Sequence, residues 1–372
     1  MTNILIAADS FKGSATSQEI GNYIQTGIQR LAPNVSTTIL PVADGGEGTL
    51  ASLLKQGGTL ETATVTGPLG KSVTENYGRL DNKTAIIEVA QVLGLPLVGP
   101  IKKPFQATSF GLGELIKLVL KQDVQRIYIA LGGSAINDAG LGMLQALGGH
   151  FTDKYGQEVG PGLTGLQQLA QIDLSQLDPR LQQITITGLS DVTNPLTGKN
   201  GATFVYGRQK GLTREQLPQC DQLVANFAKL ASRATNTQKQ AIPGAGAAGG
   251  LGFALLTFTH ATLRSGAQEI LRLLDFKTAA STADLVITGE GRMDGQSQNG
   301  KLPLIVSQIA KEFQKPVIAI VGSRAFDLKQ PTTIDLIIST VIEPQSLEKT
   351  IAQTKSLVTL AGENAWRAFN LK

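Results

Sequence analysis

Both ends of the chain alternate short apolar runs with amphipathic segments. Ile4 to Ala8 is a continuous apolar run, which is typical of a parallel strand buried on both faces. A helix is predicted next, because Thr16 and Glu19 form a capping box and residues 20–31 place apolar side chains on one face. Thr37 to Leu40 then predicts a second strand. The N-terminal segment therefore predicts a strand–helix–strand unit.

The C-terminal part of the chain repeats this pattern. Apolar runs predict three further strands, at Asp284–Thr288, Pro316–Val321 and Asp335–Ser339. Leu302 to Phe313 predicts a helix between the first two of them, and Ser346 to Phe369 predicts a single closing helix. The two ends of the chain thus predict strands of the same buried, parallel type.

The middle of the chain has a different character. It is rich in Thr and Val and contains a predicted hairpin, in which a turn at Asp81 and Asn82 joins Glu75–Leu80 to Thr84–Val89. Arg126 to Leu131 predicts a further strand, which leads through a loop into a helix. Such mixed strand signals favour a second sheet with antiparallel and parallel parts.

Together these patterns predict an α/β protein of two domains. A Rossmann-like parallel-sheet domain is expected from both chain ends, residues 1–59 and 283–372, with a larger mixed α/β domain, residues 60–282, inserted into it. The length of 372 residues agrees with this expectation, because it exceeds what one ordinary hydrophobic core encloses.

Composition and charge exclude several classes of function. The net charge of +4 is spread evenly, without the basic block that nucleic acid or an anionic membrane requires. One cysteine, Cys220, and two histidines, His150 and His260, leave neither a disulfide nor an ordinary zinc site. The N-terminus lacks the basic region of a signal peptide, and apolar runs stay shorter than a membrane span. We therefore expect a cytoplasmic protein with small-molecule partners.

Two polar loops follow the first two predicted strands. In residues 9–14, backbone amides at a helix start and the mobile charge of Lys12 suit an anion, although the glycine spacing of a Walker loop is absent and a solvated turn is the alternative. In residues 43–49, Asp44 and Glu47 stand among three glycines, which suits a magnesium site or a close approach of backbone to phosphate.

A third loop, residues 131–140, joins a predicted strand to a helix. The amides of Gly132 and Gly133 could form an anion nest, and Ser134 and Asn137 are candidate phosphate contacts. Asp138 is either a metal ligand or the N-cap of the following helix.

Another glycine-rich stretch satisfies the G-x-G-x-x-G pattern at Gly244, Gly246 and Gly249, and we pair it with a loop around Asp191. No clear strand precedes it, so it is a poor dinucleotide fingerprint. A glycine loop that opens the helix from Leu251 still suits phosphate, and helix packing through small residues is the alternative.

The last of these loops, residues 288–296, places Glu290, Arg292 and Asp294 between glycines, with Lys301 nearby. Arg292 could hold a carboxylate in two parallel hydrogen bonds, and Asp294 could accept a hydroxyl proton. With a Ser-His-Asp set and zinc excluded, glycine loops, carboxylates and cations remain, which is what phosphoryl transfer uses.

Six of these blocks, in this order, resemble the glycerate kinases: residues 9–14, 41–49, 132–135, 191–196, 244–252 and 288–296. The resemblance covers nearly the whole chain. It implies transfer of phosphate from ATP to D-glycerate, giving 2-phosphoglycerate with the help of Mg²⁺, on a Rossmann-like domain and a second α/β domain. Departures from the family pattern are small: Ala8, Ile136, Ala139 and Ser190 stand where Pro, Thr, Gly and Cys are usual.

Residue roles follow as predictions from these two lines of argument. The catalytic residues are Asp191, Asp294 and Lys12. The substrate-binding residues are Arg292, Asp9, Ser10 and Glu290. The nucleotide-binding residues are Gly132, Gly133, Ser134, Asn137, Gly244, Gly246 and Gly249. The metal ligands are Asp44, Glu47 and Asp138. Because these loops come from both predicted domains, we expect the active site between them.

Two other functions stay open at this point. A nicotinamide-dependent hydroxy-acid dehydrogenase would need the G-x-G-x-x-G motif directly after a strand. A non-catalytic protein that binds small acids would not need so many carboxylates beside glycine loops. Sequence alone leaves open which hydroxyl of glycerate reacts, which aspartate binds metal, and the oligomeric state.

Overall fold

The computed structural model describes residues 2–295 and 301–371, so Gln296 of the last motif lies outside the described residues. The chain forms two compact units: residues 1–44, 51–56 and 266–372 make the first, and residues 45–50 and 57–265 make the second. The boundaries expected near 59 and 283 therefore differ from these divisions. Residues 266–282 join the first unit, because α10 (Gly266–Leu273) and α11 (Phe276–Thr282) pack against α12 (Leu302–Glu312).

A five-stranded parallel sheet forms the centre of the first unit. Its order is β13-β12-β11-β1-β2, with all neighbours parallel. The strands are β1 (Asn3–Ala8), β2 (Ser36–Ile39), β11 (Leu285–Met293), β12 (Val317–Arg324) and β13 (Leu336–Ser339). Both chain ends contribute strands to this one sheet and meet where β1 pairs with β11, in agreement with the buried parallel strands predicted at both ends.

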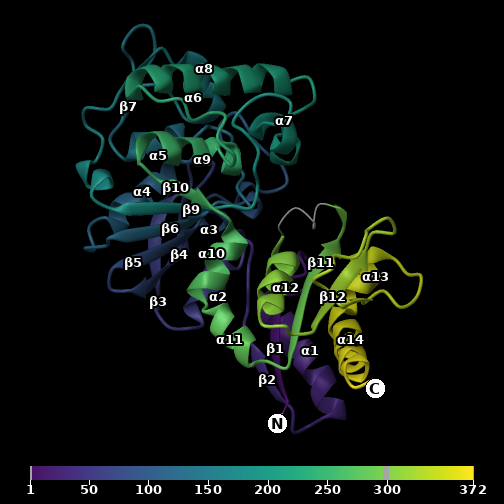
Figure 1. The fold of residues 1–372 in the computed structure, drawn as a ribbon. Helices are drawn as coiled ribbons and strands as arrows, with labels where there is room; N and C mark the ends of the chain where they lie inside the picture. The colour runs from purple at the N-terminus through teal and green to yellow at the C-terminus, as the bar shows by residue number, and fades with distance from the viewer. Residues whose placement is uncertain (1, 296–300, 372) are drawn as a thin grey trace. The chain divides into compact units, whose positions relative to one another are not determined.

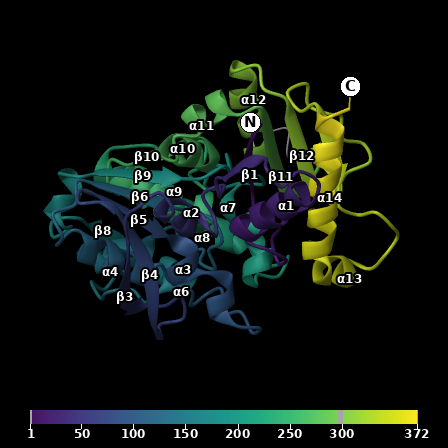
Figure 2. The same ribbon diagram turned by 90° about the horizontal axis from the view of Figure 1, so that it is seen from below.

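Helices cover both faces of this sheet. Helix α1 (Ser17–Leu31) lies beside α14 (Thr354–Phe369) on one face, and α11 and α12 lie on the other (Figures 1 and 2). Alternate strand residues such as Ile4 and Ile6 form one apolar cluster with α1 and α14. The two helices approach closely at Gly27, where a Cβ atom would lie 2.0 Å from the carbonyl oxygen of Thr359.

A six-stranded mixed sheet forms the centre of the second unit, in the order β10-β9-β6-β5-β4-β3. Strands β3, β4 and β5 pair antiparallel, and β5, β6, β9 and β10 run parallel. The strands are β3 (Thr59–Thr66), β4 (Ser72–Asp81), β5 (Thr84–Glu88), β6 (Arg126–Ala130), β9 (Thr185–Leu189) and β10 (Thr262–Arg264). A separate pair, β7 (His150–Thr152) and β8 (Gln171–Asp173), is antiparallel.

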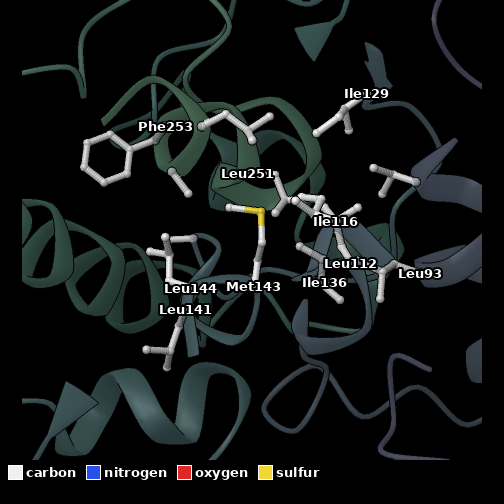
Figure 3. Packing of buried hydrophobic residues seen from close by; sticks show 14 of the residues in the cluster. Leu93, Leu112, Ile116, Ile129, Ile136, Leu141, Met143, Leu144, Leu251 and Phe253 are labelled. Carbon is white, nitrogen blue, oxygen red and sulfur yellow. The ribbon is translucent and has the colours of Figure 1, made fainter. Parts of the chain in front are cut away.

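The core of this unit is packed mainly by helices around Met143. Figure 3 shows Met143 surrounded by aliphatic side chains that include Leu112, Leu144 and Leu251. The helices are α3 (Val89–Leu93), α4 (Phe110–Val119), α5 (Leu141–Ala146), α6 (Gly162–Gln168), α7 (Ala202–Tyr206), α8 (Leu217–Thr235) and α9 (Ala247–Phe258). Cys220 is buried in α8 and belongs to this core.

The structure confirms the α/β class, with one parallel and one mixed sheet, and corrects two elements. The single closing helix predicted at 346–369 is two helices, α13 (Leu347–Ala352) and α14, with Gln353 between them. The strand predicted to end at Thr288 continues to Met293, because β12 extends alongside it and pairs Arg292 with Ser323. In residues 2–295 and 301–371, no helix has the length and apolar character that crossing a membrane would need.

Candidate active site

Charged side chains gather at the carboxyl ends of the parallel strands of the first unit. Asp9 directly follows β1, and its amide donates to the carbonyl of Gly289 in β11 (2.9 Å). Lys12 Nζ lies 3.3 Å from Asp44 Oδ2, which follows β2. Glu290, inside β11, is buried and forms an ion pair with Lys301 at 3.5 Å. In parallel sheets this edge is where ligands bind.

Asp9 is a strongly perturbed group of this cluster. Its side chain is buried, and its Oδ1 accepts a hydrogen bond from the amide of Ser10 (2.7 Å). Burial, and after it the negative charges of Asp44 and Glu290, raise the pKa of Asp9 to about 7, although Lys12 and the Ser10 amide oppose the shift. A carboxyl group with a pKa near the working pH is suited to proton transfer.

Arg292 and Asp294 form a pair at the end of β11. Arg292 Nε lies 3.5 Å from Asp294 Oδ2, and 71% of the Arg292 side chain is exposed. The guanidinium is therefore accessible from solvent at the carboxyl edge of the sheet, beside a carboxylate that orients it. Gly289 and Gly291 add no side-chain bulk to β11. A Cβ on Gly289 would lie only 2.0 Å from the carbonyl oxygen of Ile320 in β12.

In the second unit, the glycine loops of residues 45–50 and 132–134 meet at the carboxyl edge of the mixed sheet. Gly132 donates to the carbonyl of Gly45 (3.1 Å), and a Cβ on Gly132 would lie 2.5 Å from Gly46 Cα. Glu88, the last residue of β5, accepts from the amides of Gly48 (3.2 Å) and Leu50 (3.0 Å). Glu88 is fully buried, and burial raises its pKa.

The predicted nucleotide loop contains Ser134 and Asn137, both buried. Ser134 Oγ accepts from Nζ of a buried lysine, Lys210, at 3.1 Å. Asn137 Nδ2 donates to Thr203 Oγ1 at 3.1 Å. The sequence did not single out Lys210 or Glu88, because neither stands in a glycine motif, and only the tertiary structure shows their burial.

The glycine stretch at 244–250 packs onto this loop. Ala139 donates to the carbonyl of Gly249 (3.0 Å), and a Cβ on Gly249 would lie 2.0 Å from the carbonyl of Ile136. Ala248, Gly249 and Gly250 all have positive φ, so a left-handed turn opens the regular part of α9. No strand precedes the stretch, since α8 ends at Thr235. The structure therefore shows close packing through Gly246 and Gly249 and gives no support to a dinucleotide fingerprint.

Ala139, which stands where the resembled family usually has glycine, also adopts a left-handed φ of 53°. That conformation costs an L-residue about 1 kcal/mol relative to glycine. The departure is thus tolerated at a cost to stability, and its backbone still forms the bond to Gly249.

Asp191 follows β9 and accepts a hydrogen bond from Ser265 Oγ at 2.7 Å. Ser265 directly follows β10, the neighbouring parallel strand. The adjacent loop is held by Gly246, whose amide donates to the carbonyl of Asn194 (2.9 Å). The structure thus places Asp191 at the same sheet edge as Glu88 and the 132–137 loop.

Asp138 has a structural environment and not that of a metal ligand. It is fully buried, and it accepts from Ser109 N (2.7 Å), Ser109 Oγ (2.9 Å), Gly140 N (3.1 Å) and Gly142 N (3.3 Å). These four donors occupy its oxygens, and burial raises its pKa. These contacts favour a structural role over the predicted metal role, because Asp138 joins the start of α4 to the start of α5.

We expect Asp138→Ala to destabilise the protein by on the order of 3–5 kcal/mol, because three buried amide donors would lose their acceptor. Urea unfolding followed by circular dichroism measures this. Glu215→Ala, an exposed carboxylate of the same unit, should stay within about 0.5 kcal/mol of wild type. An Asp138→Ala protein as stable as the control would contradict the structural role.

The other two predicted metal ligands belong to different units, since the division falls between Asp44 and Gly45. Among the described residues, no three or more carboxylate, His or Cys side chains are grouped so as to hold a metal ion by themselves. Mg²⁺ usually binds through one or two carboxylates together with waters and phosphates. The carboxylate of Asp44 fits such a partial site, because its negative charge, which after burial is the next cause that raises the pKa of Asp9, would be neutralised by a cation.

A pocket of about 830 Å³ lies elsewhere in the second unit, between the end of β3, the start of α4 and β7. Its walls include Thr108, Gln145 and His150, and none of the predicted site residues line it. His150 pairs with Glu158 at 2.7 Å. The pocket therefore does not coincide with the predicted chemistry.

The whole chain is similar to proteins of one known family. A family model described as the glycerate kinase family matches residues 4–370. The chain is 47% identical to a glycerate kinase of Bacillus subtilis (strain 168), over 87% of this chain and 86% of that protein. It is 43% identical to a glycerate 2-kinase of Escherichia coli (strain K12), with the same coverage. A crystal structure described as glycerate kinase 2 from Salmonella typhimurium LT2 matches it with a TM-score of 0.85 at 40% identity, over 99% of this chain and 98% of that one.

Proposed function

The chain belongs to the glycerate kinase family, and from that premise we propose that it transfers the γ-phosphoryl group of MgATP to the 2-hydroxyl of D-glycerate. The observation that carries the proposal is the group of carboxylates around Asp9, facing Lys12, where β1 and β11 end. The name of the Escherichia coli relative, a glycerate 2-kinase, supports 2-phosphoglycerate as the product.

In the proposed reaction, the substrate hydroxyl oxygen forms a bond to the γ-phosphorus while the bond from that phosphorus to the bridging oxygen of ADP breaks. The hydroxyl proton passes to a carboxylate of the first unit. Asp294 was predicted for this role, and Asp9 is the stronger candidate, because its pKa of about 7 lets it hold a proton near neutral pH. Lys12 neutralises charge on the transferred phosphate.

Mg²⁺, when bound, would neutralise the negative charge that develops during phosphoryl transfer. Asp44 is the side chain of the first unit that would hold the ion, which leaves Asp9 for proton transfer. Arg292 would orient the substrate carboxylate through its fork of donors. In the second unit, the amides of Gly132 and Gly133, with Ser134, are proposed to contact phosphates of the nucleotide, and Asp191 is proposed as a second charged contact of the reaction.

Product identification tests this proposal directly. The protein is incubated with MgATP and D-glycerate, and ³¹P and ¹H NMR then distinguish 2-phosphoglycerate from 3-phosphoglycerate. Tartronate and lactate serve as alternative acceptors, and NAD replaces ATP in a parallel incubation. Formation of 3-phosphoglycerate would contradict the regiochemistry alone, whereas absence of any phosphorylated product would contradict the proposed function.

Residues of both units are expected to be necessary. Lys12→Ala, Asp191→Ala and Asp294→Ala should each lower kcat by ~10²-fold or more, the usual effect of removing an electrostatic contact to a transition state. Lys277→Ala is the control, because this exposed lysine of the first unit forms an ion pair with a surface carboxylate, Glu312. Wild-type rates in all three folded variants would contradict the proposed roles.

A further inference from the structure

Lys210 is a buried cation directly behind the predicted nucleotide loop. Its side chain is 4% exposed, and its Nζ donates to Ser134 Oγ (3.1 Å) and to the carbonyl of Ile136 (2.6 Å). It comes from the short turn Arg208–Lys210, distant in sequence from the loop that it contacts. One ammonium group thus connects two points of the segment between Gly133 and Asn137.

The protonated form of Lys210 has little electrostatic support within the protein. Burial lowers the pKa of Lys210 to about 7, and Asp138 is the charged group that opposes this shift. Asp138 is already surrounded by four hydrogen-bond donors of its own. Two other cations close to this turn, Lys102 and Arg208, are exposed, and Lys102 donates to the carbonyl of Gln209.

Asn137, at the other end of the segment, is also incompletely satisfied. It is 1% exposed, its Nδ2 donates to Thr203 Oγ1, and no described residue offers a hydrogen bond to its Oδ1. Rotating the amide by 180° would pair the oxygen with the Thr203 hydroxyl and leave the nitrogen without an acceptor. Buried polar groups are normally paired, so the segment retains capacity for a ligand.

We infer that Lys210 is a positioning residue, which holds the loop from Gly132 to Asn137 in a phosphate-binding conformation and supplies the positive charge behind it. This inference rests on the proposed function, and it names the phosphates of the nucleotide as the ligand of this loop. A neutral donor could fix Ser134 and Ile136 equally well. A buried ammonium is costly without an anion, and a bound phosphate would provide that anion.

A consequence is that nucleotide binding should take up protons. A phosphate near Lys210 favours the charged ammonium, so the pKa of Lys210 rises from about 7 when the nucleotide binds. Since the bound state holds more protons, affinity is highest below pH 7 and falls as the pH rises above it. The fall continues, at up to tenfold per pH unit, until the pKa of the bound state is reached.

Calorimetric titration of the whole protein with MgATP, without glycerate, tests this at pH 6.0 and pH 8.5. For wild type we expect the affinity to fall by ~10-fold or more between these two pH values. At pH 7.5, the binding heat should also depend on the ionisation enthalpy of the buffer, because the buffer supplies the protons that the complex takes up. Lys210→Met should bind ~30-fold more weakly at pH 6.0 and lose most of the pH dependence. Lys102→Met, which removes an exposed lysine from the same neighbourhood, should match wild type.

A folded Lys210→Met protein with wild-type affinity and pH dependence would overturn the inference. If that variant does not fold, Lys210→Arg decides, because arginine stays charged at both pH values: affinity that no longer falls between pH 6.0 and pH 8.5 supports the inference, and the pH dependence of wild type overturns it. Failure of wild type to bind MgATP contradicts both the inference and the proposed function. MgATP binding that depends on Lys210, without phosphorylation of glycerate, contradicts the proposed function alone.

Discussion

Replacing Asp9 with Asn is expected to lower kcat by ~10²-fold or more and, at pH 8, to make the protein more stable. Asn has nearly the same shape as Asp, and its side-chain oxygen can still accept from the amide of Ser10. The substitution removes a negative charge that is buried and lies in the field of Asp44 and Glu290. Activity would therefore decrease for the same reason that stability increases, as is common where functional sites hold unfavourable charges.

The sign of the pH dependence follows from the raised pKa. The pKa of Asp9 rises from 3.8 to about 7 in the folded protein, so the folded state binds more protons than the unfolded state between these values. Stability then decreases as the pH rises through this window. The advantage of Asp9→Asn should accordingly be small near pH 4 and largest at pH 8.

Thermal unfolding at pH 5 and pH 8 measures this difference, and we expect the Asp9→Asn melting temperature at pH 8 to exceed that of wild type by ~3 °C or more. Asp327→Asn, an exposed aspartate of the same unit, is the control and should change neither kcat nor melting temperature. A less stable Asp9→Asn protein at pH 8, or one with full activity, would refute the proposed electrostatics of this site.

Replacing Arg292 with Lys is expected to raise KM for D-glycerate by ~30- to 150-fold, while KM for ATP stays within a few-fold. Lysine keeps the charge and could still pair with Asp294, but it lacks the fork that holds a carboxylate in two parallel hydrogen bonds. Losing such a contact costs on the order of 2–3 kcal/mol. Steady-state kinetics with each substrate varied in turn give both constants, and Arg324→Lys, at the end of the neighbouring strand, is the matched control.

The opposite result, weaker ATP with unchanged glycerate, would assign Arg292 to the phosphate. Another cation must then hold glycerate, and Lys71, Arg79 and Lys301 are the candidates. Arg79 is bound to the carbonyl of Asn82 and to Gln122 where β4 ends, which is the sheet edge opposite to the end of β5. Lys301 pairs with Glu290 in the same unit as Arg292, so it is the better alternative.

The sequence by itself determined much of the local structure. The capping box of Thr16 and Glu19 forms as predicted, and the buried strands at both chain ends lie within a residue or two of their predicted starts. Such features depend on neighbouring residues, whose spacing is visible in the chain. The motifs after strands were found for the same reason, because a strand followed by glycines and carboxylates is a local pattern.

Only the tertiary structure decided what these motifs contact. Asp138 and Asp9 are both aspartates beside a glycine-rich loop, yet one is enclosed by four donors and the other faces two carboxylates. Lys210 looks like a solvated lysine in the sequence and becomes a buried cation because its turn, 76 residues beyond Ser134, folds against that loop. Burial and the field of distant charges arise from long-range packing, and no local pattern encodes them.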